Sequence, residues 1–114
     1  MGFKQERMEN AIHREVGRIL FEEVKDERLR FVTITTVRLT TDLSLATIYY
    51  RVIGSDEQIS STKENLLEAK GFIRKMLSNV LKVKRVPDLI FKYDESIEYG
   101  ERIDKIIEDI NEKK

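Results

Sequence analysis

Hydrophobic residues recur along the chain with two different periods, which divide it into helices and strands. Over residues 7–24 the apolar side chains return every three or four positions, which predicts an amphipathic helix. Residues 31–40 and 45–53 are rich in β-branched residues and alternate between apolar and polar, which predicts two strands. Because only a short polar turn separates these strands, we expect them to form an antiparallel hairpin.

The second half of the chain predicts a longer helix, a third strand and a closing helix. The helical pattern begins near Asp56 or Ser61 and continues to about residue 81. A strand follows Pro87, a residue that suits the entrance of a strand. Isoleucines at helical spacing predict the closing helix over about residues 97–110, with Asp94 or Ser96 as its cap. A hairpin followed by a helical crossover requires a mixed sheet with helices on one face, so residues 1–114 are expected to form one two-layer α+β domain.

Three local irregularities carry further predictions. In the first strand, Ile34 and Val37 have opposite parity, so either a bulge near residues 35–36 resets the alternation or both faces are partly covered. Gly17 lies inside the first helix, where glycine costs about 1 kcal/mol, and a close contact with the sheet would explain it. Gly71 is expected to break the second long helix, through close packing, a kink, or an opening that lets a phosphate approach the backbone.

The formal net charge of zero conceals a strong polarity along the chain. Between residues 70 and 92 there are seven basic residues and one acid, Asp88, which leaves a surplus of six positive charges. From residue 94 onward four basic residues oppose eight acids, which leaves four negative charges. An excess of one sign this large over a short segment favours a charged binding surface over an ordinary solvated face.

We therefore predict a basic ridge that binds the phosphates of RNA. Residues spaced by four lie on one helix face, and later lysine and arginine residues extend that face beyond the helix end. The alternative is a solvated face whose last-turn cations complement the helix dipole. The candidate RNA-binding residues are Lys70, Arg74, Lys75, Lys82, Lys84 and Arg85.

Catalytic chemistry is not predicted. The single histidine, His13, has no cysteine to activate and is expected to be a solvated helix residue. The five glycines form no phosphate-binding motif. Asp94 and Glu95 could contribute to a Mg²⁺ site but more simply charge a helix N-terminus, so neither a metal nor a cofactor is expected. The absence of cysteine and of any apolar run of transmembrane length predicts a cytoplasmic location away from membranes.

Several short segments of the sequence resemble the bacterial ribosome-binding factor A family. They are AKGFIR at 69–74, VPDL at 86–89 and YDESIE at 93–98, and earlier segments agree in order over residues 7–110. The resemblance implies a fold like the type II KH domain, in which an Ala-x-Gly kink between two helices replaces the usual Gly-x-x-Gly loop. That kink corresponds here to Ala69 and Gly71. The resemblance also implies a monomer that binds ribosomal RNA, aids late maturation of the small subunit and rRNA processing, and supports cold adaptation.

Two functional hypotheses follow, with a third disfavoured. The first is a non-catalytic assembly factor that places its basic ridge on the RNA of the small ribosomal subunit. The second is an adaptor whose acidic closing helix contacts a ribosomal protein. A small RNA-processing enzyme is disfavoured because the sequence lacks catalytic groups. Since no Gly-x-x-Gly loop is present, we expect recognition of shape and phosphates with little reading of bases.

Overall fold

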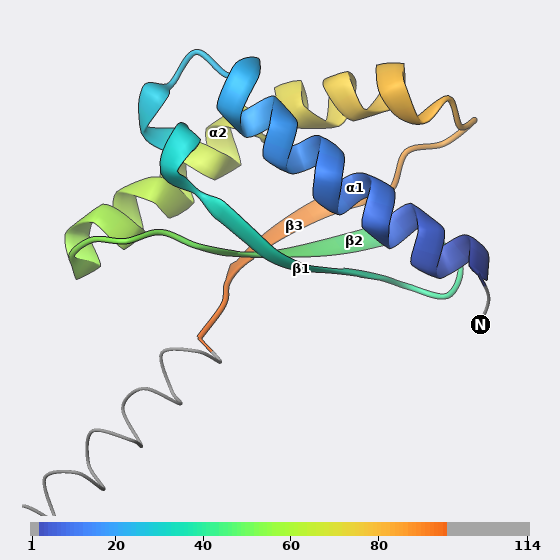
Figure 1. Cartoon of the computed structure of the whole chain (residues 1–114), viewed down its shortest axis with the longest axis horizontal. Helices are drawn as coiled ribbons and strands as arrows, with labels where there is room; N and C mark the ends of the chain where they lie inside the picture. Colours follow the sequence, from blue (N-terminus) through green and yellow to red (C-terminus); the bar gives the residue numbers. More distant parts are fainter. Residues whose placement is uncertain (1–2, 96–114) are drawn as a thin grey trace, which may run out of the picture.

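The two long helices lie on the same side of a three-stranded sheet (Figure 1). The structure is a computed structural model that describes residues 3–95. Its elements are α1 (Phe3–Glu22), the 3-10 helix η1 (Glu27–Phe31), β1 (Thr33–Leu39), β2 (Leu45–Arg51), α2 (Asp56–Leu81) and β3 (Asp88–Tyr93). The predicted two-layer α+β architecture is confirmed. No helix in the described part of the chain is long and apolar enough to cross a membrane.

The sheet is mixed and has the strand order β1-β2-β3. β1 and β2 pair antiparallel, as the short turn predicted, whereas β2 and β3 pair parallel. A parallel neighbour needs a long crossover connection, and α2 supplies it. The sequence pattern left the strand order open, and the structure places β2 at the centre.

A β-bulge in β1 resolves the change of parity in that strand. The register with β2 shifts between Ile34 and Thr36, so Thr35 is the extra residue. The bulge lets both Ile34 and Val37 face the core, where each is less than one-tenth exposed. The Thr35 hydroxyl donates a hydrogen bond to the Asp94 carboxylate beyond the end of β3. The bulge was one of two predicted explanations, and the structure confirms it.

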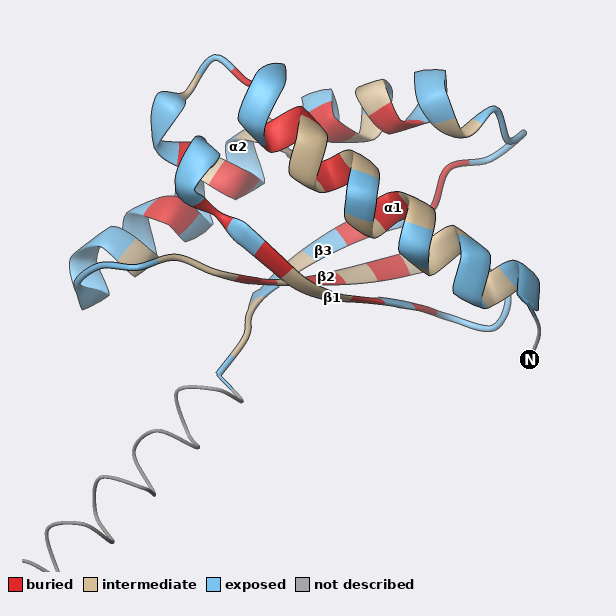
Figure 2. Ribbon diagram, in the orientation of Figure 1, coloured by how far each residue is buried: buried red, intermediate tan, exposed pale blue. Residues whose placement is uncertain are grey.

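One hydrophobic core fills the space between the helices and the sheet (Figure 2). The buried side chains at its centre are Ile12, Val16, Ile19 and Leu20 of α1, Leu66, Ile73 and Leu77 of α2, and Ala46, Ile48, Tyr50 and Leu89 of the sheet. The Tyr50 ring meets the Tyr93 ring edge to face, with centroids 5.7 Å apart. Burying each large apolar side chain contributes about 1.5–3 kcal/mol, so this layer supplies most of the favourable free energy of folding.

Polar side chains of α1 cover the free edge of β1. Gln5 donates to the Leu39 carbonyl at 2.8 Å, and the Glu9 carboxylate accepts from the Leu39 N–H at 2.9 Å. The His13 imidazole donates from Nε2 to the Ile34 carbonyl at 2.9 Å. An unpaired strand edge can pair with the strands of other chains, and these three bonds occupy some of its free N–H and C=O groups. The prediction that His13 is a solvated helix residue is therefore wrong.

α1 begins at Phe3, four residues earlier than the pattern predicted, and runs through Gly17 without a break. A Cβ added at Gly17 would meet no heavy atom within 4 Å. The predicted close approach of helix and sheet at this glycine is therefore wrong. Nothing in the structure requires a glycine there.

α2 is one continuous helix rather than two. It begins in a capping box, in which the Ser55 hydroxyl accepts from the Gln58 N–H and the Gln58 side chain accepts from the Ser55 N–H. The helix continues through Gly71, so the predicted break into two helices does not occur. Figure 1 shows instead that the two halves of α2 run in different directions, which bends the helix over the sheet. The closing helix predicted for residues 97–110 lies outside the described residues.

The turn between β1 and β2 is built around the Asp42 carboxylate. It accepts hydrogen bonds from the Thr40 hydroxyl at 2.7 Å, the Ser44 hydroxyl at 2.7 Å and the Ser44 N–H at 3.1 Å. These bonds lower the pKa of Asp42 from 3.8 to about 2. Leu43 completes the turn with a φ of 62°. The charged form of Asp42 is therefore the one that holds the turn.

We predict that Asp42→Asn lowers the melting temperature at neutral pH. The pKa of Asp42 is depressed in the folded state, so its contribution is present above pH 3.8 and is lost as the pH falls through about 2. The difference in melting temperature between wild type and Asp42→Asn should accordingly shrink over that interval, as followed by circular dichroism. A difference that stays constant from about pH 5 to about pH 2 would contradict this role.

Candidate nucleic-acid interface

The loop between α2 and β3 has anchored ends and an exposed basic tip. Lys82 ends α2 in the left-handed conformation, with φ 52° and ψ 40°, and so turns the chain back toward the sheet. At the other end Val86 and Pro87 are buried. Between these points Lys84 and Arg85 are exposed to solvent. The loop therefore presents two cations from a short, held segment.

Arg74 ties this loop to α2. Its Nη2 donates to the Val86 carbonyl at 2.8 Å and its Nε donates to the Pro87 carbonyl at 3.2 Å. The Asp88 carboxylate lies 3.5 Å from the same Nε. The guanidinium thus bonds mainly to the protein's own loop and positions the residues that the loop carries. Direct contact between Arg74 and a phosphate stays a prediction.

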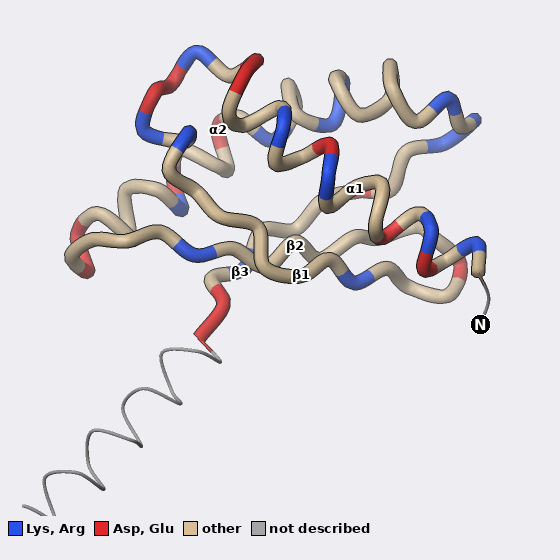
Figure 3. Tube along the Cα trace, in the orientation of Figure 1, with Lys and Arg blue, Asp and Glu red and all other residues tan. Residues whose placement is uncertain are grey.

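An open groove lies between the second half of α2 and this loop. Its volume is about 390 Å³. It is lined by Gly71, Arg74, Lys75, Ser78, Val83, Lys84, Arg85 and Val86. Figure 3 shows basic residues along the end of α2 and in the loop that follows it, the two segments that line the groove. The groove therefore brings together cations from two separate segments of the chain.

Gly71 leaves one position on the α2 wall of the groove without a side chain. It is exposed, and a Cβ added there would meet no heavy atom within 4 Å. Close packing therefore does not explain this glycine. A ligand in the groove can instead approach the helix backbone closely at this point.

The structure separates the predicted ridge into two groups. Arg74, Lys75, Lys84 and Arg85 line the groove together with Gly71. Lys70 and Lys82 do not line it: Lys70 is half-buried one turn before Arg74, and Lys82 is exposed at the helix end. Ala69, the other predicted kink residue, packs against the hydrophobic core.

Apart from Gly71, sequence reasoning missed the uncharged residues of the groove. Ser78 lies on the same helix face as Gly71 and Arg74, at a spacing of seven and four residues, so helical periodicity could have identified it. Its hydroxyl donates to the Lys75 carbonyl at 2.6 Å. Val83 could not have been assigned from periodicity, because it lies beyond the end of the helix.

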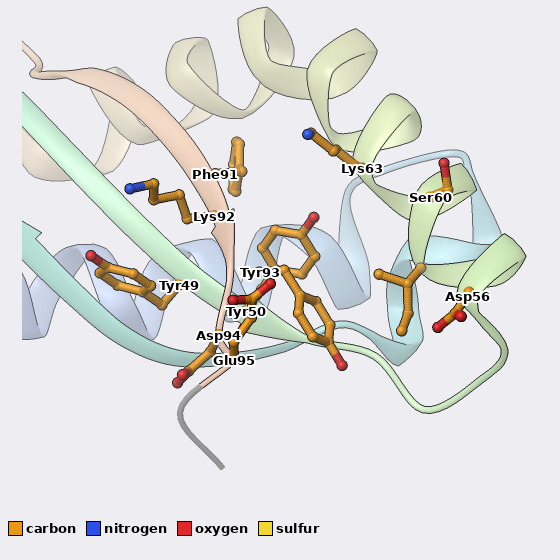
Figure 4. A pocket seen from close by; sticks show the side chains of 11 residues that line it. Tyr49, Tyr50, Asp56, Ser60, Lys63, Phe91, Lys92, Tyr93, Asp94 and Glu95 are labelled. Atoms are coloured by element: carbon orange, nitrogen blue, oxygen red, sulfur yellow. The ribbon is translucent and has the colours of Figure 1, made fainter. Parts of the chain in front are cut away.

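A larger hollow of about 670 Å³ runs along β3 beside the first half of α2 (Figure 4). It carries Lys63 and Lys92 but also three carboxylates, Asp56, Asp94 and Glu95. A surface of mixed sign attracts phosphate less than one of a single sign does. The smaller groove is therefore the better phosphate site.

The described residues offer little for catalysis. Within residues 3–95, no three His, Cys, Asp or Glu side chains form a group that could hold a metal ion. His13 bonds to a strand carbonyl, and Asp94 accepts from Thr35. What the groove can do chemically is bind an anion.

Comparison with known proteins identifies the family of this chain. The family model described as ribosome-binding factor A matches residues 4–107. The chain belongs to this family. A ribosome-binding factor A from Geotalea daltonii is 47% identical over 107 residues, which are 94% of this chain and 87% of the relative.

Solved structures of the ribosome-binding factor A family share the fold. The crystal structure of the Thermus thermophilus protein matches with a TM-score of 0.70 at 22% identity, over 81% of this chain and 97% of that one. A model of the Thermus thermophilus factor, fitted into a cryo-EM map of its complex with the 30S subunit, matches with a TM-score of 0.61 at 21% identity. It covers 84% of this chain and 97% of that one. The predicted KH-like fold is thus confirmed.

We predict that Arg74→Ala lowers the free energy of unfolding by about 1–2 kcal/mol, because two carbonyls lose a charged donor and the site is partly open to water. Arg74→Lys should not restore it, since an ammonium group cannot reproduce the planar fork. Lys75→Ala, an exposed neighbour, should change stability by less than about 0.5 kcal/mol. Urea denaturation of the three variants tests this, and equal effects of Arg74→Ala and Lys75→Ala would contradict it.

Proposed function

We propose that this chain is a non-catalytic assembly factor that binds the small ribosomal subunit through its ribosomal RNA. The observation that carries the proposal is the groove, where Lys75, Lys84 and Arg85 surround the exposed backbone at Gly71. No ion pair involves these three cations among the described residues. They are therefore available to an external anion.

The shape of the groove favours a phosphate backbone over a small anion. Its cations come from two segments on opposite walls, so they can meet successive phosphates of one strand. Because Arg74 holds the loop against α2, Lys84 and Arg85 are presented from an ordered segment, which reduces the entropy lost on binding. Lysine and arginine side chains that contact only phosphates recognise the shape and charge of the RNA backbone and do not recognise its base sequence.

Family membership supports the choice of the small subunit as partner. The fitted Thermus thermophilus relative is described in a complex with the 30S subunit. Action late in subunit maturation, support of rRNA processing and adaptation to cold belong to the same proposal and rest on the family resemblance alone. A cytoplasmic location, expected from the composition of the chain, and a monomeric state belong to it as well. Ribosomal proteins are proposed as further partners on the subunit.

The adaptor hypothesis has no comparable support. It requires the acidic segment that follows residue 95, which lies outside the described residues. The RNA-binding proposal is therefore preferred.

We predict that the double variant Lys75→Glu, Lys84→Glu abolishes co-sedimentation with small subunits at moderate salt, because it reverses the charge on both walls of the groove. Arg14→Glu is a matched control, since its side chain is 73% exposed on α1, away from the groove. The binding constant of each single alanine variant, at Lys75, Lys84 or Arg85, should also be measured against salt concentration. Where the wild-type residue contacts a phosphate, the log–log slope of that variant should be flatter than the wild-type slope by about one unit. Unchanged slopes for all three alanine variants would refute the proposal.

We predict that Gly71→Ala and Gly17→Ala have the same effect on stability and different effects on binding. Each added Cβ meets open space, so each change should raise the free energy of unfolding by about 0.4–1 kcal/mol. Only the Gly71 methyl group projects beside the groove, so only Gly71→Ala should weaken subunit binding. Denaturation and co-sedimentation of both variants check this, and equal binding would show that the bare backbone at Gly71 has no role.

A further inference from the structure

The sheet has a second face that none of the described elements covers. α1 and α2 both lie on the opposite side (Figure 1). Because side chains alternate along a strand, the residues between the buried positions point to this open face. They include Thr36 and Arg38 of β1, Thr47, Tyr49 and Arg51 of β2, and Ile90 and Lys92 of β3.

Tyr49 lies at the centre of this open face. It pairs with Thr36 on β1 and with Lys92 on β3. Figure 4 shows Tyr49 and Lys92 projecting from neighbouring strands to the same side of β3, and both line the hollow that Phe91 and Lys63 also line. Neighbouring strands are about 4.8 Å apart, so Thr36 and Lys92 flank Tyr49, which is half-buried and keeps part of its side chain exposed.

Cations surround this tyrosine. Arg38 is two residues beyond Thr36 on β1, and Arg51 is two residues beyond Tyr49 on β2. Within residues 3–95, neither they nor Lys92 take part in an ion pair. The acids of the sheet lie at its ends, where Asp88 is close to Arg74 and Asp94 accepts from Thr35. The charged residues in the middle of the open face are therefore cations, and the carboxylates that share the hollow with Tyr49 and Lys92 come from α2 and from beyond the end of β3.

A solvated sheet face is the ordinary alternative, since antiparallel sheets commonly expose a polar face to water. Such a face has no need of an aromatic ring at its centre, nor of cations of one sign around it. A ring flanked by cations is the arrangement that binds single-stranded nucleic acid, because any base can stack on the ring while the cations meet the adjoining phosphates.

We propose that the open face of the sheet binds an unpaired strand of RNA, with one base stacked on Tyr49 and flanking phosphates near Arg38 and Lys92. The inference rests on the proposed function and adds to it a second surface, separate from the groove. The groove would hold the backbone of folded RNA, and the sheet would hold a single strand beside it.

The test uses the full chain and two labelled probes, an eight-nucleotide oligouridylate and an A-form RNA duplex of the same length, with binding followed by fluorescence anisotropy. Tyr49→Leu should weaken binding of the single strand about fivefold or more, the equivalent of one lost stacking contact, and leave duplex binding unchanged. Tyr49→Phe keeps the stacking ring and should bind like wild type. Arg38→Gln and Lys92→Gln should each flatten the salt slope for the single strand by about 0.7.

The outcomes distinguish this inference from the proposed function. If Tyr49→Leu binds oligouridylate like wild type while it melts normally, the inference is overturned. If Tyr49→Leu reduces subunit co-sedimentation alone, the face contacts a protein, and the inference is again overturned. Should Tyr49→Leu fail to fold, the glutamine variants decide, since unchanged salt slopes for both would overturn the inference. The double variant Lys75→Glu, Lys84→Glu tests the groove separately, because it should lose subunit binding whatever the sheet does.

Discussion

The apolar side chains of the three-stranded sheet can be buried on one of its faces only, and the rest of this molecule depends on that constraint. Three strands expose two faces, and α1 and α2 together cover only one of them (Figure 2). Every strand must therefore direct its apolar residues to the same side. The bulge at Thr35 meets this requirement within β1, because without it Ile34 and Val37 would point to opposite faces.

The same constraint places both candidate binding surfaces. Since β3 pairs parallel to β2, the chain must cross back over the covered face, and α2 with its following loop makes that crossing. The loop ends beside the helix it has just left, so the groove forms where the crossover ends. Arg74 stabilises the junction by bonding to the carbonyls of Val86 and Pro87. The face left uncovered by the crossover is the one that carries Tyr49.

Gly71 shows how far a single residue can be interpreted before its surroundings are known. The sequence allowed close packing, a kink or an exposed backbone at this position. Open space around its Cβ position excludes close packing, and the continuous helix excludes a complete break. A bend of the continuous helix and an exposed backbone beside a basic groove are what remain, and Gly17, which is equally unobstructed but far from the groove, is the natural comparison.

Local pattern determined the two long helices, the three strands, the hairpin and the one-sided sheet, because hydrophobic period and turn length act between residues close in the chain. It offered the bulge as one of two explanations and did not predict the 3-10 helix η1. It also located the positive segment that contains Lys75, Lys84 and Arg85. Tertiary structure decided which of those cations share a groove, because Arg74 folds the loop against α2 through bonds to residues twelve and thirteen positions away. It likewise decided that His13 closes a strand edge and that Tyr49 lies among cations from three strands. These contacts join distant segments, and no spacing along a single element encodes them.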